Sequence, residues 1–195
     1  FSERLLREFQ TVGFNVGKLN SLQTLYSSGG PSLNFSKNDS TTFFNAQHEL
    51  VSHKALNKHV SSMSVYLSGK EYIVSDYGTI TLESFCQSVF NMNTTAFKDY
   101  LKGLTQGYSL LVPQSGNTKA SPSLQSVCIL PLRNGNGGQY GILFLFLNDA
   151  QISKELDAVA GQNMDYFIVG KDQTLLFFSG DMADTLSTVG VDRLT

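Results

Sequence analysis

Apolar residues recur at three- and four-residue steps through the first 27 residues of the chain. The positions are Leu5, Phe9, Val12, Val16, Leu19 and Tyr26, widened by Leu6, Leu22 and Leu25. This spacing predicts one long amphipathic helix over residues 2–27, ended by Ser28-Gly29-Gly30-Pro31. Because the spacing is close to a heptad, part of the stripe either faces a second copy of the chain or covers the domain's own sheet.

A second helical pattern follows a polar loop, with Asp39 or Ser40 as its cap, and runs to about His59. All three histidines of the chain fall in this segment. The five-residue step from His48 to His53 turns their rings about 140° apart on a helix, and His48 and His59 lie about 16 Å apart along its axis. The pattern therefore predicts solvated histidines on a helix surface rather than a metal site.

The hydrophobic period changes from helix to strand in Ser62–Gly78. β-Branched and aromatic residues flank Ser68-Gly69-Lys70, which predicts a β-hairpin. Alternation along the first strand predicts that Ser64 and Tyr66 share one face of the sheet. The opposite face carries apolar side chains that suit packing on the long helix, at Met63, Val65 and Leu67.

Downstream of the hairpin, helical and strand patterns alternate. They predict helices over 83–91 and 96–104, strands over 108–112, 124–133 and 139–148, a helix over 149–160, and a hairpin of strands 166–169 and 174–179. The glycine-rich link 134–138 joins two strands, so it is a hairpin loop, since a phosphate-binding loop needs a helix behind it.

This order of elements predicts an α+β fold, with a PAS-like antiparallel sheet flanked by a long N-terminal helix. Residues 1–150 are expected to form one lobe. Residues 151–195 are expected to hold a linker helix and the start of a second, smaller lobe. The chain opens at Phe1 without Met, and we expect it to be a piece of a longer protein.

Charge and cysteine content narrow the classes of function. The net charge of −2 across 195 residues offers no basic stripe for direct contact with nucleic acid. The only cysteines, Cys86 and Cys128, have apolar neighbours and predict two reduced, buried thiols. No nucleophile stands at a workable spacing from a base, so the sequence predicts neither an enzyme nor a cofactor. The longest apolar run, Ile142–Leu147, is far shorter than the roughly 20 residues of a membrane-spanning helix.

The pattern resembles the double Cache sensor domains found outside the membrane in bacterial signalling proteins. The segments that carry the resemblance are the hairpin Met63–Gly78, G-I-L-F-L-F-L-N at 141–148, I-S-K-E-L at 152–156, and D-Y-F-I-V-G-K-D-Q-T-L-L-F-F-S at 165–179. The closest likeness is to those that precede AraC-type regulators and histidine kinases in Gram-positive bacteria. The chain has no Trp. It therefore lacks the arginine–tryptophan–aspartate arrangement of amino-acid-binding Cache domains.

The resemblance implies an extracellular ligand-sensing domain of a bacterial transmembrane signal-transduction protein. It places residues 1–147 in the membrane-distal lobe, with the proximal lobe starting at about 160. Membrane-spanning helices would lie beyond both ends of the chain, and the domain itself would stand on the extracellular face of the cell membrane. A small-molecule ligand is implied, and a homodimer through the N-terminal helix is a further expectation. Two alternatives stay open, a structural or dimerisation module without a small ligand and a cytosolic PAS-like sensor.

A ligand pocket is expected on the sheet face that lies under the short helices. Its predicted residues are Ser64, Tyr66, Asp76, Tyr77, Phe85 and Tyr108. Hydroxyl and carboxylate groups around an apolar floor suit a small polar ligand. The alternative is that the tyrosines are ordinary half-buried strand residues.

Overall fold

The computed structural model describes residues 2–28, 30, 32, 37–103, 109–111, 126–160, 167–169 and 175–178. Its helices are α1 (Ser2–Val16), α2 (Asn20–Ser28), α3 (Lys37–Ala55), α4 (Leu82–Phe85), the π-helical turn η1 (Cys86–Phe90), α5 (Thr94–Gly103) and α6 (Asp149–Ala160). Its strands are β1 (Val60–Leu67), β2 (Tyr72–Ser75), β3 (Gly78–Thr81), β4 (Ser109–Leu111), β5 (Val127–Arg133), β6 (Gln139–Leu147), β7 (Phe167–Val169) and β8 (Leu175–Phe178).

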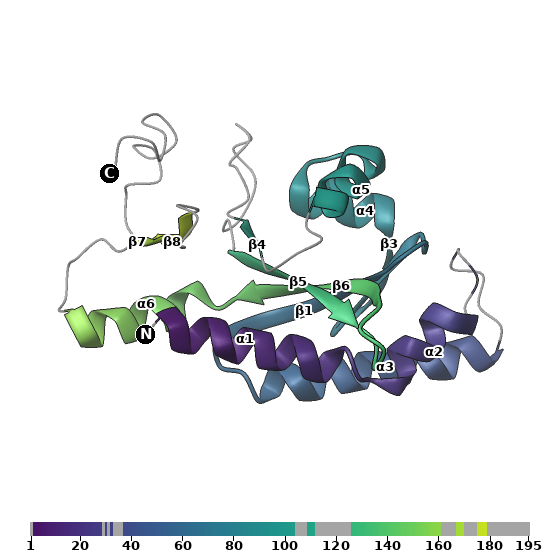
Figure 1. Ribbon diagram of the computed structural model, residues 1–195, viewed down its shortest axis with the longest axis horizontal. Helices are drawn as coiled ribbons and strands as arrows, with labels where there is room; N and C mark the ends of the chain where they lie inside the picture. Colours follow the sequence, from purple (N-terminus) through teal and green to yellow (C-terminus); the bar gives the residue numbers. More distant parts are fainter. Residues whose placement is uncertain are drawn as a thin grey trace.

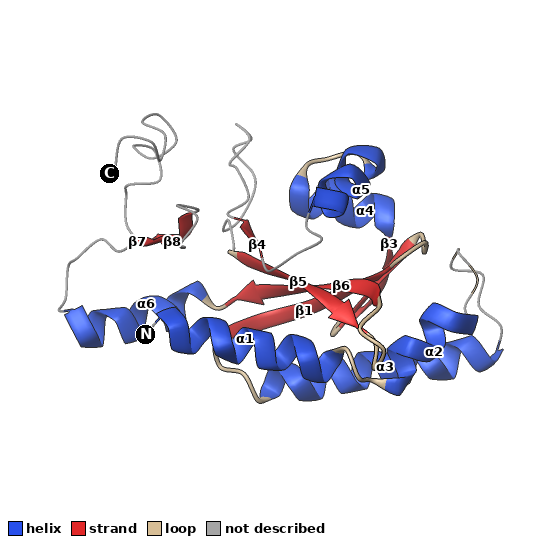
Figure 2. Ribbon diagram, in the orientation of Figure 1, coloured by secondary structure: helices blue, strands red, loops and turns tan. Residues whose placement is uncertain are grey.

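A six-stranded antiparallel sheet in the order β3-β2-β1-β6-β5-β4 separates two helical layers. Helices α1, α2 and α3 lie along one face, and α4 and α5 lie over the other (Figure 2). The α+β class predicted from the sequence is confirmed. A second sheet of β7 and β8 stands where the last predicted hairpin was expected.

The two central strands, β1 and β6, are buried on both faces over most of their length. They pair side by side, with Val65 opposite Leu143 and Leu67 opposite Gly141. A Cβ atom on Gly141 would lie 2.6 Å from the backbone oxygen of Tyr66. Glycine is therefore required where these two strands approach each other.

The helical layer is packed as the alternation of β1 predicts. Met63, Val65 and Leu67 face the helices, and Tyr66 belongs to the cluster on the opposite face. The apolar stripe of α1 is buried in the same layer, at Leu5, Phe9, Val12 and Val16. This part of the stripe therefore covers the domain's own sheet.

The prediction of one helix over residues 2–27 is wrong, because the chain breaks into α1 and α2 between Val16 and Asn20. The carbonyl oxygen of Gly17 accepts hydrogen bonds from the Tyr140 hydroxyl at 3.0 Å and from the Gln23 side chain at 3.0 Å. A Cβ atom on Gly17 would lie 3.1 Å from the Arg133 carbonyl oxygen. A glycine here lets the end of α1 approach the β5–β6 hairpin, and the bonds to Tyr140 and Gln23 replace a continued helix.

The predicted second helix is confirmed as α3, but its bounds differ. It begins at Lys37, so Asp39 and Ser40 lie inside its first turns instead of capping it, and it ends at Ala55, so His59 is not part of it. The Asn57 side chain donates to the carbonyl oxygen of His53 at 2.8 Å and satisfies the end of the helix. The chain then turns, and His59 lies immediately before β1 with 1% of its surface exposed. The prediction that His59 is solvated on a helix surface is wrong.

Between β2 and α5, the structure departs from the predicted boundaries. Residues 78–81 form the edge strand β3, paired with β2, where only a lead into a helix was expected. The helix expected over 83–91 is a single α-turn followed by the π-turn η1. Asn91, in the left-handed region at φ 51°, ends it.

The later elements agree closely with their predictions. Strands β5 and β6, their hairpin link and helix α6 all lie within a few residues of the expected bounds. Cys86 and Cys128 are free and buried, as predicted. The division into lobes at residue 150 stays a prediction. Among the described helices, none combines the length and apolar character needed to cross a membrane.

Candidate functional site

An aromatic layer fills the space between the sheet and α4, η1 and α5. Phe85 is fully buried at its centre, with ring centroids 5.2 Å from Phe144, 5.7 Å from Phe90 and 6.1 Å from Phe97. Tyr66 extends the layer along β1, with its ring 6.4 Å from that of Phe97. Edge-on and tilted contacts of this kind add to the stability that burial supplies.

Ser64 is a buried polar residue on this aromatic side of the sheet. It lies directly opposite Phe144 in the β1–β6 pair, so the two side chains share a face. Ser64 is fully buried, and within the described residues its hydroxyl has no hydrogen-bond partner. A buried hydroxyl without a partner costs about 1–3 kcal/mol. A ligand hydroxyl, amide or carboxylate reaching this group would remove that cost.

Two other buried polar atoms lack a partner in the part of the chain that the structure describes, the Tyr72 hydroxyl and one oxygen of Asp149. Tyr72 belongs to the helical layer on the opposite face. The second oxygen of Asp149 accepts a hydrogen bond from the Ser126 amide at 3.1 Å. Of the three, Ser64 is the one opposite a phenylalanine of the aromatic layer.

The other predicted site residues are arranged differently. Asp76 lies on the helical side and joins α3 to the first hairpin: its carboxylate accepts from Lys54 at 2.5 Å, from the Ser62 hydroxyl at 2.7 Å and from the Met63 amide at 3.0 Å. Tyr77 stands in the turn between β2 and β3 with 60% of its surface exposed. Tyr108 lies outside the described residues. The structure therefore groups Ser64, Tyr66 and Phe85, and sets Asp76 and Tyr77 apart from them.

Cys86, which the site prediction omitted, opens the π-turn against the aromatic layer. Burial raises the pKa of its thiol to about 11 and that of Cys128 to about 12. Burial likewise raises the pKa of the Tyr66 phenol, and the neighbouring Cys86 adds to that shift. These groups are thus neutral near pH 7 and offer hydrogen bonds rather than charge. Single π-turns are frequent at functional sites, but no sequence signal separates them from an α-turn.

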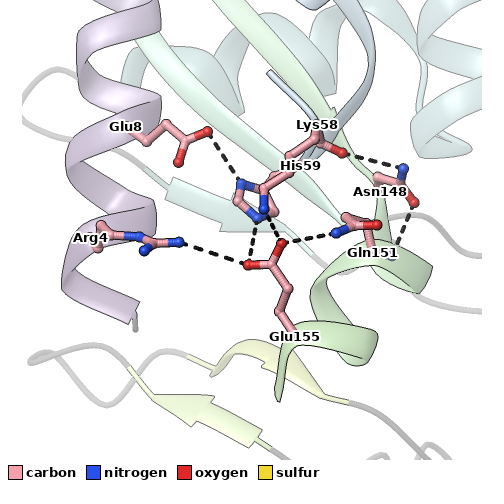
Figure 3. A network of polar contacts seen from close by, with 7 residues as sticks. All are labelled: Arg4, Glu8, Lys58, His59, Asn148, Gln151 and Glu155. Atoms are coloured by element: carbon pink, nitrogen blue, oxygen red, sulfur yellow. Dashed lines mark hydrogen bonds and ion pairs between the residues drawn. The ribbon is translucent and has the colours of Figure 1, made fainter. Parts of the chain in front are cut away.

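A second polar cluster surrounds His59, which lies just before β1 and between α1 and α6 (Figure 3). Its Nδ1 atom lies 3.2 Å from an oxygen of Glu8 in α1, and its Nε2 atom lies 3.1 Å from an oxygen of Glu155 in α6. Glu155 also accepts from Lys58 at 2.5 Å and from Gln151 at 2.9 Å. The hydrogen bonds from Lys58, Gln151 and His59 lower the pKa of Glu155 to about 2.

The start of α6 is also hydrogen-bonded to His59. The Asn148 amide donates to the backbone oxygen of His59 at 2.8 Å, and the Asn148 side chain accepts from the Gln151 amide at 3.2 Å as the helix cap. Sequence analysis missed this cluster because Glu8 and Glu155 are 51 and 96 residues from His59. Among the described residues, no group of three or more His, Cys, Asp and Glu side chains is arranged to hold a metal ion.

Comparison with known proteins finds neither a protein-family model nor a curated protein that matches this chain.

Proposed function

We propose that the chain is a ligand-sensing domain of a bacterial transmembrane signalling protein, displayed on the extracellular face of the membrane. The observation that carries the proposal is the Ser64 hydroxyl, which is fully buried without a partner in the described residues. Ser64 shares its sheet face with Phe144, which packs against Phe85 of α4. This is the face that α4 and α5 cover (Figure 1). A short helical cap over one sheet face, with α1 and α3 sealing the other, suits a site that binds a small molecule.

The ligand chemistry follows from the groups at hand. Ser64 and Tyr66 supply neutral hydroxyls, and Phe85 and Phe144 supply aromatic surface. An uncharged or weakly charged small molecule with an apolar portion fits these groups. Its binding requires the aromatic rings to shift, because they pack against one another in this structure.

A thermal-shift screen of small metabolites tests the proposal. A ligand at one hundred times its Kd stabilises a folded protein by about 2.7 kcal/mol. We expect the shift in Tm to be lost in Ser64→Ala and reduced in Tyr66→Phe. Ser62→Ala is the matched control on the same strand, because its hydroxyl bonds to Asp76 instead. That variant should have a lower Tm and keep the full ligand shift. A ligand shift that persists in Ser64→Ala would overturn the proposed site.

A dimerisation module without a small ligand is the second candidate, and α3 supplies the observation that favours it. Phe44 and Val51, seven residues apart on this helix, are exposed, and Leu56 just beyond it is 82% exposed. The inward stripe of α1 is already buried in its own domain, so a dimer through α1 would rest on outward residues such as Phe14. Sedimentation of Phe44→Ser and of Phe14→Ser distinguishes the two helices. A monomeric parent domain would speak against this candidate.

A further inference from the structure

We propose that the His59–Glu8–Glu155 cluster is a pH-sensitive clamp that holds α6 against α1 and the start of β1. The clamp is closed when the His59 ring carries a proton on both nitrogens and opens when it loses one. The clamp lies apart from the Ser64 site and does not depend on the binding of a small molecule there.

The geometry requires the doubly protonated ring. A carboxylate only accepts hydrogen bonds, and each ring nitrogen of His59 faces a carboxylate oxygen, at 3.2 Å for Glu8 and 3.1 Å for Glu155. A neutral imidazole has one N–H and one lone pair, so one of the two contacts would become repulsive. With 1% of the ring exposed, water cannot easily replace the lost hydrogen bond.

Three parts of the chain place charged side chains around His59: α1, the segment before β1, and α6. Helix α1 contributes Arg4, 3.8 Å from Glu155, and Glu8; the segment before β1 contributes Lys58, 2.5 Å from Glu155. Helix α6 contributes Glu155 itself, 3.1 Å from the ring. The side chains of Arg4 and Lys58 are 70% and 61% exposed, so solvent weakens their attraction for Glu155. His59 is the buried member of the group, with 1% of its side chain exposed.

Histidine is the side chain that ordinarily changes charge between about pH 5 and 8. Glu155 is held ionised throughout that range by its hydrogen-bond donors. The proton that decides the state of the clamp is therefore the second one on the imidazole ring, because a ring without it cannot donate to both carboxylates. Because the closed clamp uses the protonated ring, its contribution is present at lower pH and is lost as the pH rises.

Opening the clamp affects the second half of α6. Its first turn is held independently, by the Asn148 cap and by Ile152, which is fully buried. Glu155 begins the second half of the helix, which leads the chain toward β7 and β8. Beyond Ile152, Leu156 is partly buried against the same core, and Glu155 makes the polar contacts to His59 and Lys58. Opening the clamp therefore removes one of the contacts that hold the helix after Ile152, while its start stays docked. Helix α6 would carry a change in acidity from the sheet domain toward the C-terminal residues.

Amide hydrogen exchange of the 195-residue chain at about pH 5.5 and about pH 8.5, corrected for the intrinsic rates, tests the clamp. In the parent chain, we expect the protection of residues 154–158 to fall at least threefold at the higher pH, with residues of β6 unchanged. In Glu155→Gln, protection of these residues should be low and equal at both values. His48→Gln is the control, since His48 is exposed on α3, and it should keep the parental response.

His59→Gln should behave like Glu155→Gln. If that variant fails to fold, Glu8→Gln replaces it, because Glu8 is partly exposed on α1. Equal protection at both pH values in the parent chain would overturn the proposal. A pH response that persists in Glu155→Gln would overturn it as well.

Discussion

The two faces of the central sheet use different side chains for different purposes. The helical face is mainly aliphatic, and polar groups at its margins join elements together: Asp76 binds α3, Tyr140 binds the end of α1, and His59 joins α1 to α6. The opposite face is richer in aromatic side chains, and the buried hydroxyl of Ser64 opposite Phe144 has no hydrogen-bond partner in the described residues.

This difference separates stability from binding. A polar group whose hydrogen bonds are all made inside the fold contributes to stability and has no capacity left for a ligand. A buried hydroxyl left without a partner lowers stability and keeps that capacity. The Tyr72 hydroxyl, on the helical face, also has no partner among the described residues. The comparison therefore rests on the polar groups that join elements: Asp76, Tyr140 and His59 hold the fold, whereas Ser64 on the aromatic side is assigned to recognition. Substitutions in these two sets should have effects of different size and sign.

Phe9→Ala should have the largest effect. Phe9 is almost fully buried between α1 and the sheet, and truncating a buried phenylalanine costs about 3–5 kcal/mol. Urea unfolding measures the loss. Phe14→Ala, on the exposed side of the same helix, should cost only about 0.5–1 kcal/mol, the size of the contact that Lys18 makes over its ring at 3.8 Å. Equal losses in the two variants would contradict the assignment of the stripe to the domain's own core.

Asp76→Asn should destabilise the fold by about 2–3 kcal/mol in the same unfolding assay. The substitution leaves Lys54 without its counter-ion, and the estimate is reduced from that of a fully buried pair because Lys54 is about one-third exposed. Asp99→Asn is the control, because the exposed pair of Asp99 and Lys102 should contribute little. If Asp76 instead belonged to a ligand site, its replacement would change ligand affinity with little loss of stability.

Acid should destabilise the cluster around His59 through Glu155. The pKa of this carboxyl is lowered from 4.5 to about 2 in the folded state. Its ionised form therefore stabilises the fold above about pH 4.5, and that contribution is lost as the pH falls toward about 2. The urea midpoint of the parent chain should fall across this range more steeply than that of Glu155→Gln. If the urea midpoints of the two proteins fell equally with pH, the hydrogen bonds to ionised Glu155 would not stabilise the folded state.

Ser64→Ala should have the smallest effect and the opposite sign. Removing a buried hydroxyl that has no partner leaves stability unchanged or raises it by up to about 1 kcal/mol. Ser75→Ala, on the neighbouring strand, is the matched control, because its hydroxyl donates to the Gly78 carbonyl oxygen at 2.7 Å and its loss should be destabilising. A clear destabilisation by Ser64→Ala would mean that its hydroxyl is bonded in solution.

The local hydrophobic pattern was sufficient to predict the elements whose contacts are made by residues near in sequence. The hairpin at Gly69, which adopts φ 80°, and the alternation of Ser64 and Tyr66 against Val65 follow from period and turn chemistry alone. So does helix α6 after its Asn148 cap. The grouping of Ser64, Tyr66 and Phe85 on one side of the sheet also follows from alternation and from the apolar face of the next helix.

Tertiary structure decided the features that depend on distant partners. The first helix ends at Val16 because Tyr140, 123 residues away, binds the Gly17 carbonyl oxygen, while the local period continues to residue 26. Asp76 lies on the helical side because Lys54 reaches it from α3. His59 is buried because Glu8 and Glu155 converge on it from two other helices. A hydrogen bond or an ion pair between residues far apart in sequence does not change the local hydrophobic pattern. Such a contact can therefore be identified only in the folded structure.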